Sequence, residues 1–338
     1  LAERALQLQP DLPEAHLARG FSYYYGDNNF DAALKEFKIA QIGLPNESEV
    51  YLALGAIQRR QGKWNESTEN LEKAVSLNPK DIWALQNLAF NYQMLRDFDK
   101  ANKTIDRALA LDPLALGPME VKSKLAILGK GDFSVAEKAF QAVESAPVSA
   151  EEKLKTAIAR AEVFLLERKY QQGLQQAESL SDADLDRYPG ALWGKYYYIG
   201  FARKALQDEP AAQTAFQRAK TEAEQRVKQS PDSEDAHIQL AKVLAYLGEK
   251  DAALAEAQRA TELLPESKDA FGGPEITVGV AEVCAILGEN ERAIQILDGL
   301  LSRPSSVTVE SLKMNPTWDR LRSDARFQAL LQKYGDKA

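Results

Sequence analysis

The stretch LALGAIQRRQGKWNESTENLEKAVSLNP, residues 52–79, decides the fold because two later stretches repeat it. LQNLAFNYQMLRDFDKANKTIDRALALDP at 85–113 aligns with it, and IQLAKVLAYLGEKDAALAEAQRATELLP at 238–265 matches both. The period is about 34 residues, which is typical of an array of helical repeats. Each repeat of such an array buries its apolar face against its neighbours. The sequence therefore predicts an all-α solenoid.

Small and large residues recur at fixed places inside each repeat, and each place has a physical reason. Gly55, Ala89 and Ala241 lie on the first helix, where a small side chain lets the second helix approach closely. Glycine there costs up to about 1 kcal/mol of helix propensity, which contact with a large residue such as Leu71 offsets. Proline then ends the second helices, at Pro45, Pro79, Pro113 and Pro265. Tight turns between the helices are expected at Asp27, Gly62 and Gly248.

Together these residues resemble the tetratricopeptide repeat, a helix–turn–helix repeat with the pattern Trp-x2-Leu-Gly-x2-Tyr, then Ala-x3-Phe, then Pro. The resemblance implies a right-handed α-solenoid with C-terminal capping helices. The period divides the chain into a trailing helix of an upstream repeat (1–9), regular repeats (10–114), degenerate repeats (115–189), further repeats (190–303) and a cap (304–338). Lys124 stands where a small residue is expected, so we predict a bend or break near 115–190.

The tail MNPTWDRLRSDARFQALL, residues 314–331, differs from the repeats. Asn315 and Pro316 are typical of a helix start, and Trp318 and Phe327 belong to an apolar face beneath charged residues. An array needs such a cover, because its last repeat would otherwise leave an apolar face in water. The tail also resembles the one that closes many bacterial tetratricopeptide regions. There the repeats follow a winged-helix, nucleotide cyclase or Ser/Thr kinase domain.

Composition and charge exclude several classes of partner. The chain has 42 basic and 50 acidic residues, a net charge of −8 and no basic block, so no nucleic-acid partner is expected. No run of about 18 apolar residues is present, so no membrane span is expected. Leu1 opens the chain without a methionine and already in helical spacing, which indicates a piece of a longer protein. We expect a cytoplasmic location, with the periplasm as the alternative.

Three side chains with chemical potential fall at interior positions of their repeats. His16 and His237 occupy the same place, where a bulky residue is needed between the helices. Cys284 falls where a core aromatic is usual, which favours a small buried thiol. Two histidines on separate repeats make no ligand set. All three are expected to be packing residues.

Two short stretches mimic ligand-binding loops without meeting their requirements. The aspartates of SDADLDRYPG, residues 181–190, alternate as calcium ligands do. Arg187, however, replaces the required glycine, and Trp193 replaces the bidentate glutamate. LGKGDFSV, residues 128–135, lacks the spacing of a phosphate-binding loop. We therefore expect no enzyme activity, no cofactor and no metal.

First helices line the concave surface of a solenoid, so their outward positions predict a partner-binding groove. In the first three repeats these positions hold aromatic residues, arginines and glutamines: Phe21, Tyr24, Tyr25, Arg59, Arg60, Trp83, Gln86, Phe90 and Gln93. A second cluster consists of Tyr197, Phe201 and Lys204. Aromatics and arginine are enriched at binding hot spots, and a guanidinium fork matches a carboxylate. We predict a protein or peptide partner, with Arg59 and Arg60 holding an acidic group or a carboxy terminus.

A packing interpretation of the same residues stays open. Phe21, Tyr24 and Phe90 can pack between neighbouring helices, and the paired arginines can form a solvated face, because aromatics at helical spacing often pack. The carboxylate clamp known in the tetratricopeptide family also needs Lys and Asn where this chain has Leu17 and Phe21. Recognition of chaperone tails is therefore not expected.

The sequence thus predicts a non-catalytic protein-interaction scaffold, the partner-binding or sensing region of a larger bacterial regulatory protein. A periplasmic or lipoprotein scaffold for envelope assembly is one alternative. Another is the substrate-selecting region of an enzyme whose catalytic domain lies outside this sequence.

Overall fold

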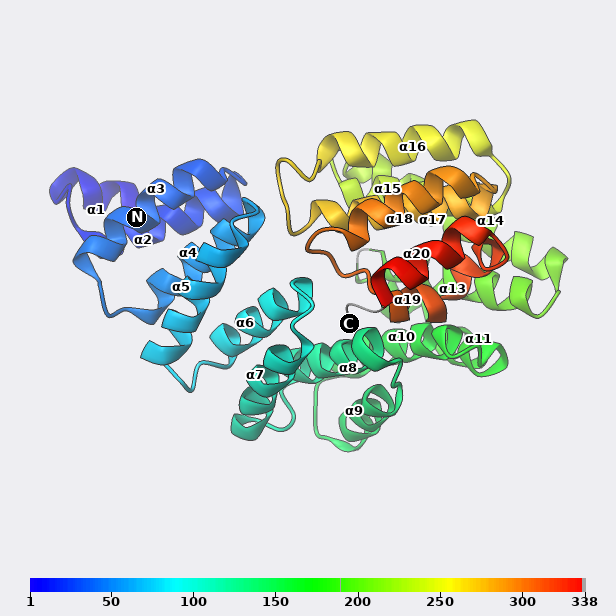
Figure 1. The fold of residues 1–338 in the computed structure, drawn as a ribbon, viewed down its shortest axis with the longest axis horizontal. Coiled ribbons are helices and arrows are strands. Elements are labelled where there is room, and N and C mark those ends of the chain that lie inside the picture. Colours follow the sequence, from blue (N-terminus) through cyan, green and yellow to red (C-terminus); the bar gives the residue numbers. More distant parts are fainter. Residues whose placement is uncertain (189, 336–338) are drawn as a thin grey trace. The chain divides into compact units, whose positions relative to one another are not determined.

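The computed structural model of the chain describes residues 1–188 and 190–335. Within these ranges the regular structure is helical and no strand occurs, as Figure 1 shows. The predicted all-α class is therefore confirmed. The helices group into two compact units: unit 1 contains Leu1–Leu125 and Glu266–Gly272, and unit 2 contains Ala126–Pro265 and Gly273–Ala338.

Unit 1 begins with the short helix α1 (Ala2–Leu8) and continues as helix pairs. The pairs are α2 (Pro13–Phe21), extended by the π-helical turn η1 (Ser22–Gly26), with α3 (Phe30–Gly43); α4 (Ser48–Arg60) with α5 (Trp64–Leu77); and α6 (Ile82–Met94) with α7 (Phe98–Leu111). Helix α8 (Leu116–Lys130) begins in unit 1 and ends in unit 2. The three pairs lie within residues 10–114.

Unit 2 holds the remaining pairs and the cap. The helices are α9 (Ser134–Ser145), α10 (Ala150–Leu166), α11 (Tyr170–Ser179), α12 (Asp182–Leu185), α13 (Ala191–Ala205), α14 (Glu209–Gln229), α15 (Glu234–Tyr246), α16 (Lys250–Leu263), α17 (Gly273–Leu287), α18 (Asn290–Leu301), α19 (Val309–Met314), η2 (Pro316–Leu321) and α20 (Ala325–Gly335). In Figure 1 helices α15–α18 lie side by side, in yellow to orange. The 21-residue α14 is the longest of these helices.

The close approach of paired helices occurs where the sequence places small residues. A Cβ atom added at Gly55 would lie 2.6 Å from Cγ of Leu71, and one at Gly20 would lie 2.4 Å from the ring of Phe37. Both partners are fully buried. The predicted pairing of a small residue with a large one is therefore the contact that joins α4 to α5 and α2 to α3.

A left-handed residue recurs in the turn between the paired helices. Gly62 has φ of +73° and Gly248 of +80°. The amide after each of them donates back to a carbonyl four residues before the glycine, at 2.8 Å for Lys63 and 2.9 Å for Glu249, which is the Schellman arrangement. The corresponding turns of other pairs place non-glycine residues at positive φ: Asn28, Arg96, Arg168 and Gln207.

The tail that the sequence predicts as a C-terminal cap packs against the last helix pair. Trp318, Leu321, Phe327 and Leu330 are buried in one cluster with apolar residues of α17 and α18. The Asn315 side chain accepts from the Thr317 amide at 2.9 Å and so caps η2. The last repeat is thereby covered as an array requires.

The cap also contacts the region where the repeat pattern degenerates. The Thr308 hydroxyl donates to the main-chain oxygen of Leu128 at 2.7 Å. Met314 packs into the cluster of Ile127, Phe133 and Phe140. Contact with the cap gives these residues a packing environment that differs from that between two repeats.

His16 and His237 lie inside their helix pairs, as predicted, but their surroundings are polar. The Nδ1 atom of His16 lies 2.7 Å from a carboxylate oxygen of Glu36, and its Nε2 lies 2.9 Å from the main-chain oxygen of Pro10. His237 makes the same two contacts, with Glu256 and with Pro231. Each ring ties its first helix to the second helix and to the preceding turn.

Candidate functional site

The candidate site lies at the end of α4, where Arg59 and Arg60 meet the turn 266–272. These seven residues, between α16 and α17 in the sequence, belong to unit 1. The Arg59 and Arg60 side chains reach the turn because they occupy the last positions of α4, before the left-handed residue Gly62. We call Tyr24, Phe30, Arg59, Arg60 and Asn87 the arginine surface.

Asp269 is the residue of the turn that Arg60 holds. Its side chain is 2% exposed, and its Oδ1 accepts from the amides of Phe271 and Gly272, each at 2.9 Å. Its Oδ2 accepts from Nη1 of Arg60 in a short ion pair. The Ala270 amide donates to the main-chain oxygen of Arg60 at 2.7 Å. Arg60 therefore binds the turn through both its side chain and its main chain.

Aromatic rings surround the Arg60 guanidinium. Its Nε donates to the Tyr24 hydroxyl at 2.8 Å, and its central carbon lies 5.5 Å from the ring of Phe30 and 5.7 Å from that of Phe271. Burial by itself would lower the pKa of Arg60, but the hydrogen bonds and charges of Tyr24 and Asp269 outweigh it and raise that pKa. The cation is thus held by a carboxylate, a phenol and ring faces.

Arg59 is a more deeply buried cation, with 4% of its surface exposed. The ring of Phe271 covers its guanidinium at 4.1 Å. Its hydrogen bonds go to the side-chain oxygen of Asn87 at 3.1 Å and the main-chain oxygen of Asn87 at 3.4 Å, and its Nε has no partner in the described chain. Burial lowers the pKa of Arg59 to about 10. A buried guanidinium without a paired carboxylate is costly to keep.

The structure brings together only part of the predicted groove. Tyr24, Arg59 and Arg60 meet on the arginine surface, whereas Phe21 packs edge-on against Phe37 at 5.1 Å and Phe90 packs on the apolar cluster that α5, α6, α7 and α8 share. For these two phenylalanines the packing interpretation holds. The arginines do not form the solvated face of that interpretation, because both contact the turn 266–272 of the same chain.

The other predicted groove residues differ in exposure. Tyr25 and Trp83 are 70% and 56% exposed, beside Tyr24 and one helical turn before Asn87, respectively. Gln86 lies against Gly117, and Gln93 is buried. Exposed aromatics next to a buried cation are typical of a contact surface.

Sequence reasoning missed Phe30, Asn87 and the turn 266–272. Phe30 and Asn87 belong to predicted helices, but no pattern marks them as neighbours of the arginines. The turn is more than 200 residues away, and its contact with Arg60 follows only from the tertiary structure. The sequence signal that could have indicated this contact is an acidic and an aromatic residue, Asp269 and Phe271, in the short connection between α16 and α17.

The second predicted cluster lies in unit 2. Phe201 and Lys204 line a cavity of about 340 Å³ together with Tyr170, Tyr246, Pro316 and Arg320 among others. Tyr197 is not in its wall and instead stacks on Trp193 at a centroid distance of 4.8 Å. Lys204 pairs with Glu209 at 3.0 Å. The cluster is therefore divided between a cavity and the core.

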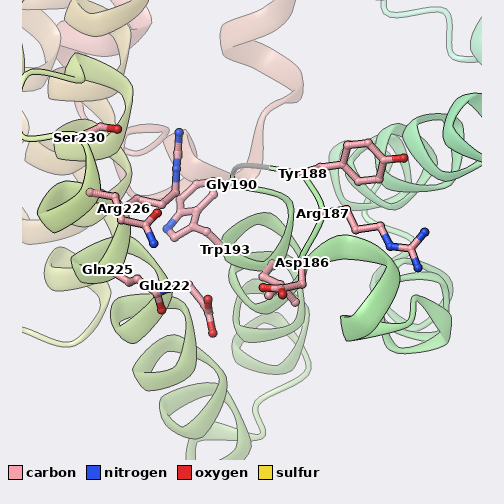
Figure 2. Close-up of a pocket in the computed structure, with 11 residues that line it drawn as sticks. Asp186, Arg187, Tyr188, Gly190, Trp193, Glu222, Gln225, Arg226 and Ser230 are labelled. Carbon is pink, nitrogen blue, oxygen red and sulfur yellow. The ribbon is translucent and has the colours of Figure 1, made fainter.

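A further hollow of about 270 Å³ lies between the residues that follow α12 and helices α13 and α14. Figure 2 shows Trp193 beside Arg226, while the side chains of Arg187 and Tyr188 point away from them. The Nε1 of Trp193 has no hydrogen-bond partner among the described residues. The lining of the hollow carries both signs of charge, with Asp186 and Glu222 as well as Arg187 and Arg226. The hollow favours no particular ligand charge.

Searches for metal and membrane features cover residues 1–188 and 190–335. No group of three or more His, Cys, Asp or Glu side chains there could hold a metal ion. No helix in these ranges has the length and apolar character needed to cross a membrane. Cys284 is fully buried, and burial raises the pKa of its thiol.

Comparison with known proteins finds a family match for part of the chain. Residues 58–116 match the family model of the tetratricopeptide repeat. The helix pairs on either side of this segment have the same helix–turn–helix form. Repeats of this family are generally non-catalytic scaffolds that bind proteins or peptides. No curated protein matches the sequence.

Several solved structures are similar in part. A crystal structure of MamA is 20% identical over 62% of this chain and 96% of its own, with a TM-score of 0.34. A second MamA structure is 18% identical over 64% and 95%, with a TM-score of 0.31. The APC/C hetero-tetramer Cut9–Hcn1 is 14% identical over 78% and 42%, with a TM-score of 0.44. Likeness at this level carries no functional conclusion.

Proposed function

We propose that the chain is a non-catalytic protein-binding scaffold whose first three helix pairs recognise an acidic peptide segment of a partner protein. The arginine surface is the recognition site. The observation that carries the proposal is the contact of Arg60 with a short peptide segment, in which its side chain holds the carboxylate of Asp269 and its main-chain oxygen accepts from Ala270.

Arg59 supports an acidic partner independently. It is buried beside Arg60 and lacks a carboxylate partner among the described residues. Two adjacent guanidinium groups in a chain with a net charge of −8 form a local exception to the overall charge. An acidic side chain or a carboxy terminus would relieve the cost of the second cation through charge-assisted hydrogen bonds.

The tail of residues 314–331 supports a context for this binding. Its resemblance to the tails of bacterial tetratricopeptide regulators favours a partner-binding or sensing region of a larger cytoplasmic regulatory protein. In that context the occupancy of the arginine surface would be the input to an effector domain.

A random peptide library displayed on phage and panned on the full chain tests the recognition. We expect enrichment of Asp and Glu, and loss of binding by the recovered peptides to Arg59→Ala/Arg60→Ala. The matched control is Lys103→Ala/Arg107→Ala, which removes two exposed cations from α7 of the same unit. Recovery of peptides without acidic enrichment, or equal binding to the Arg59→Ala/Arg60→Ala variant, would overturn the proposal.

A further inference from the structure

Three consecutive residues of the turn 266–272 contact the arginine surface in three chemically different ways. Asp269 supplies a carboxylate to Arg60, Ala270 supplies a main-chain amide to the Arg60 carbonyl, and Phe271 supplies a ring face to Arg59. A carboxylate, a backbone bond and an aromatic ring are the elements by which repeat surfaces bind peptides in trans. Here they come from the same chain.

We infer that the turn 266–272 is an intramolecular ligand of the arginine surface, and that the external partner carries the same pattern of an acidic, a small and an aromatic residue. The inference rests on the proposed function and specifies its ligand. Asp269 is almost fully buried in this contact, so the carboxylate of an outside peptide can take its place on Arg60 only by displacing the turn.

The small middle residue follows from the geometry of Gly62. A Cβ atom at Gly62 would lie 3.4 Å from Cβ of Ala270, and Gly62 has φ of +73°. The backbone of the surface therefore approaches the middle residue of the ligand closely. A side chain larger than alanine at that position would meet the turn between α4 and α5.

The turn leaves part of the surrounding surface uncovered, which lets a partner compete with it. Tyr25 and Trp83 remain 70% and 56% exposed. A partner that presents the acidic–small–aromatic pattern within a longer segment can cover these rings as well, and so gain apolar area that the turn does not bury. The tethered turn acts at an effective concentration in the millimolar range. Binding of short peptides to the intact chain is accordingly weak.

Fluorescence anisotropy with a fluorescein-labelled ESKDAFG peptide (residues 266–272) on the full chain provides the test. We expect Asp269→Asn/Phe271→Ala to bind the peptide roughly tenfold more tightly than the unmodified chain, because the tethered competitor is weakened. Adding Arg60→Ala should remove this gain, and labelled ESKNAAG should not bind. Ser267→Ala/Lys268→Ala alters exposed residues of the same turn and should leave the affinity unchanged.

The outcomes separate this inference from the proposed function. If the folded Asp269→Asn/Phe271→Ala variant binds the peptide no more tightly than the unmodified chain, while Arg60→Ala weakens both, the turn is a structural connection and the recognition site stands. If no variant binds this peptide or any acidic library peptide, both proposals fail. Should the double variant lose its helical circular dichroism, the isosteric Asp269→Asn is measured alone, with an expected gain in the same direction.

Discussion

Arg168, at the left-handed turn between α10 and α11, forms a two-point ion pair with Asp319 of the cap. Its Nη1 and Nη2 atoms lie 2.6 Å from Oδ2 and Oδ1 of the carboxylate. Arg322 donates to the same Oδ1 at 2.7 Å. The pair ties an irregular helix pair to residues that cover the end of the array, and both belong to unit 2.

Asp319→Asn should lower the free energy of unfolding at neutral pH by about 0.2–1 kcal/mol, the range for exposed ion pairs. Both side chains are about two-fifths exposed, at 42% and 41%, so solvent screens the pair. The measurement is urea unfolding followed by circular dichroism. A double-mutant cycle with Arg168→Gln should give a coupling energy of the same size, and a coupling of zero would contradict the prediction.

The same pair makes stability depend on pH. Burial by itself would raise the pKa of Asp319, but the hydrogen bonds of Arg168 and Arg322 outweigh it and lower that pKa. The stabilisation is therefore fully present above the unfolded pKa of about 3.9 and is lost as the pH falls through the lower folded value. The unmodified chain and Asp319→Asn should differ in unfolding midpoint at pH 7 and converge at about pH 2. A difference that persists in acid would contradict this assignment.

Left-handed turn residues give a second test of stability. Gln207 has φ of +63°, a conformation that costs a non-glycine residue about 1 kcal/mol or more. Gln207→Gly should therefore raise the free energy of unfolding by roughly 1 kcal/mol, and Gly248→Ala should lower it by a similar amount. An added Cβ at Gly248 meets no described atom within 4 Å, so the loss would be a backbone effect.

Gly26→Ala is the control for the turn prediction. A Cβ there also meets no described atom within 4 Å, and Gly26 does not have a left-handed φ. Its replacement should cause no loss of stability. Equal effects of alanine at Gly26 and Gly248 would show that the backbone conformation is not the cause.

The period of the sequence predicted the helix pairs because the residues that pack within each pair recur with that period. Such local packing patterns can be recognised in a single sequence. Small residues such as Gly55 and Ala89 and large ones such as Leu71 and Ile105 could be assigned to the helix contacts in advance, since each pair has the same spacing in its repeat. The left-handed role of Gln207 was less visible because the residue is not a glycine. The contact of the turn 266–272 with Arg60 could not be predicted, because it depends on the tertiary structure. The turn also lies between two repeats, so it leaves the repeat pattern unchanged. The groove around Arg59 and Arg60 therefore stays a prediction, and the sequence did not indicate that the turn 266–272 covers these residues.

Two glycines of α13 separate close packing from helix propensity. A Cβ at Gly200 would lie 2.7 Å from the ring of Phe216, whereas the nearest described atom to one at Gly194 is Cε2 of Tyr198 at 3.9 Å. Gly200→Ala should destabilise by about 1–3 kcal/mol through overpacking. Gly194→Ala should stabilise by up to about 1 kcal/mol because alanine favours the helix. Urea unfolding of both variants is the measurement, and a stabilised Gly200→Ala would disprove the close contact.

Arg59→Met separates binding from packing at the candidate site. Methionine fills similar space without a buried charge, so the free energy of unfolding should stay equal or rise by about 1–4 kcal/mol. Its pKa, which burial lowers to about 10, indicates that the fold disfavours the charged form. Acidic peptides recovered with the unmodified chain should bind the variant roughly tenfold less tightly, because the guanidinium that an acidic or aromatic side chain of the peptide contacts is lost. Arg107→Met, an exposed replacement in α7, should change neither quantity. Reduced stability with unchanged peptide affinity would show that Arg59 only packs α4 against α6 and does not bind the peptide.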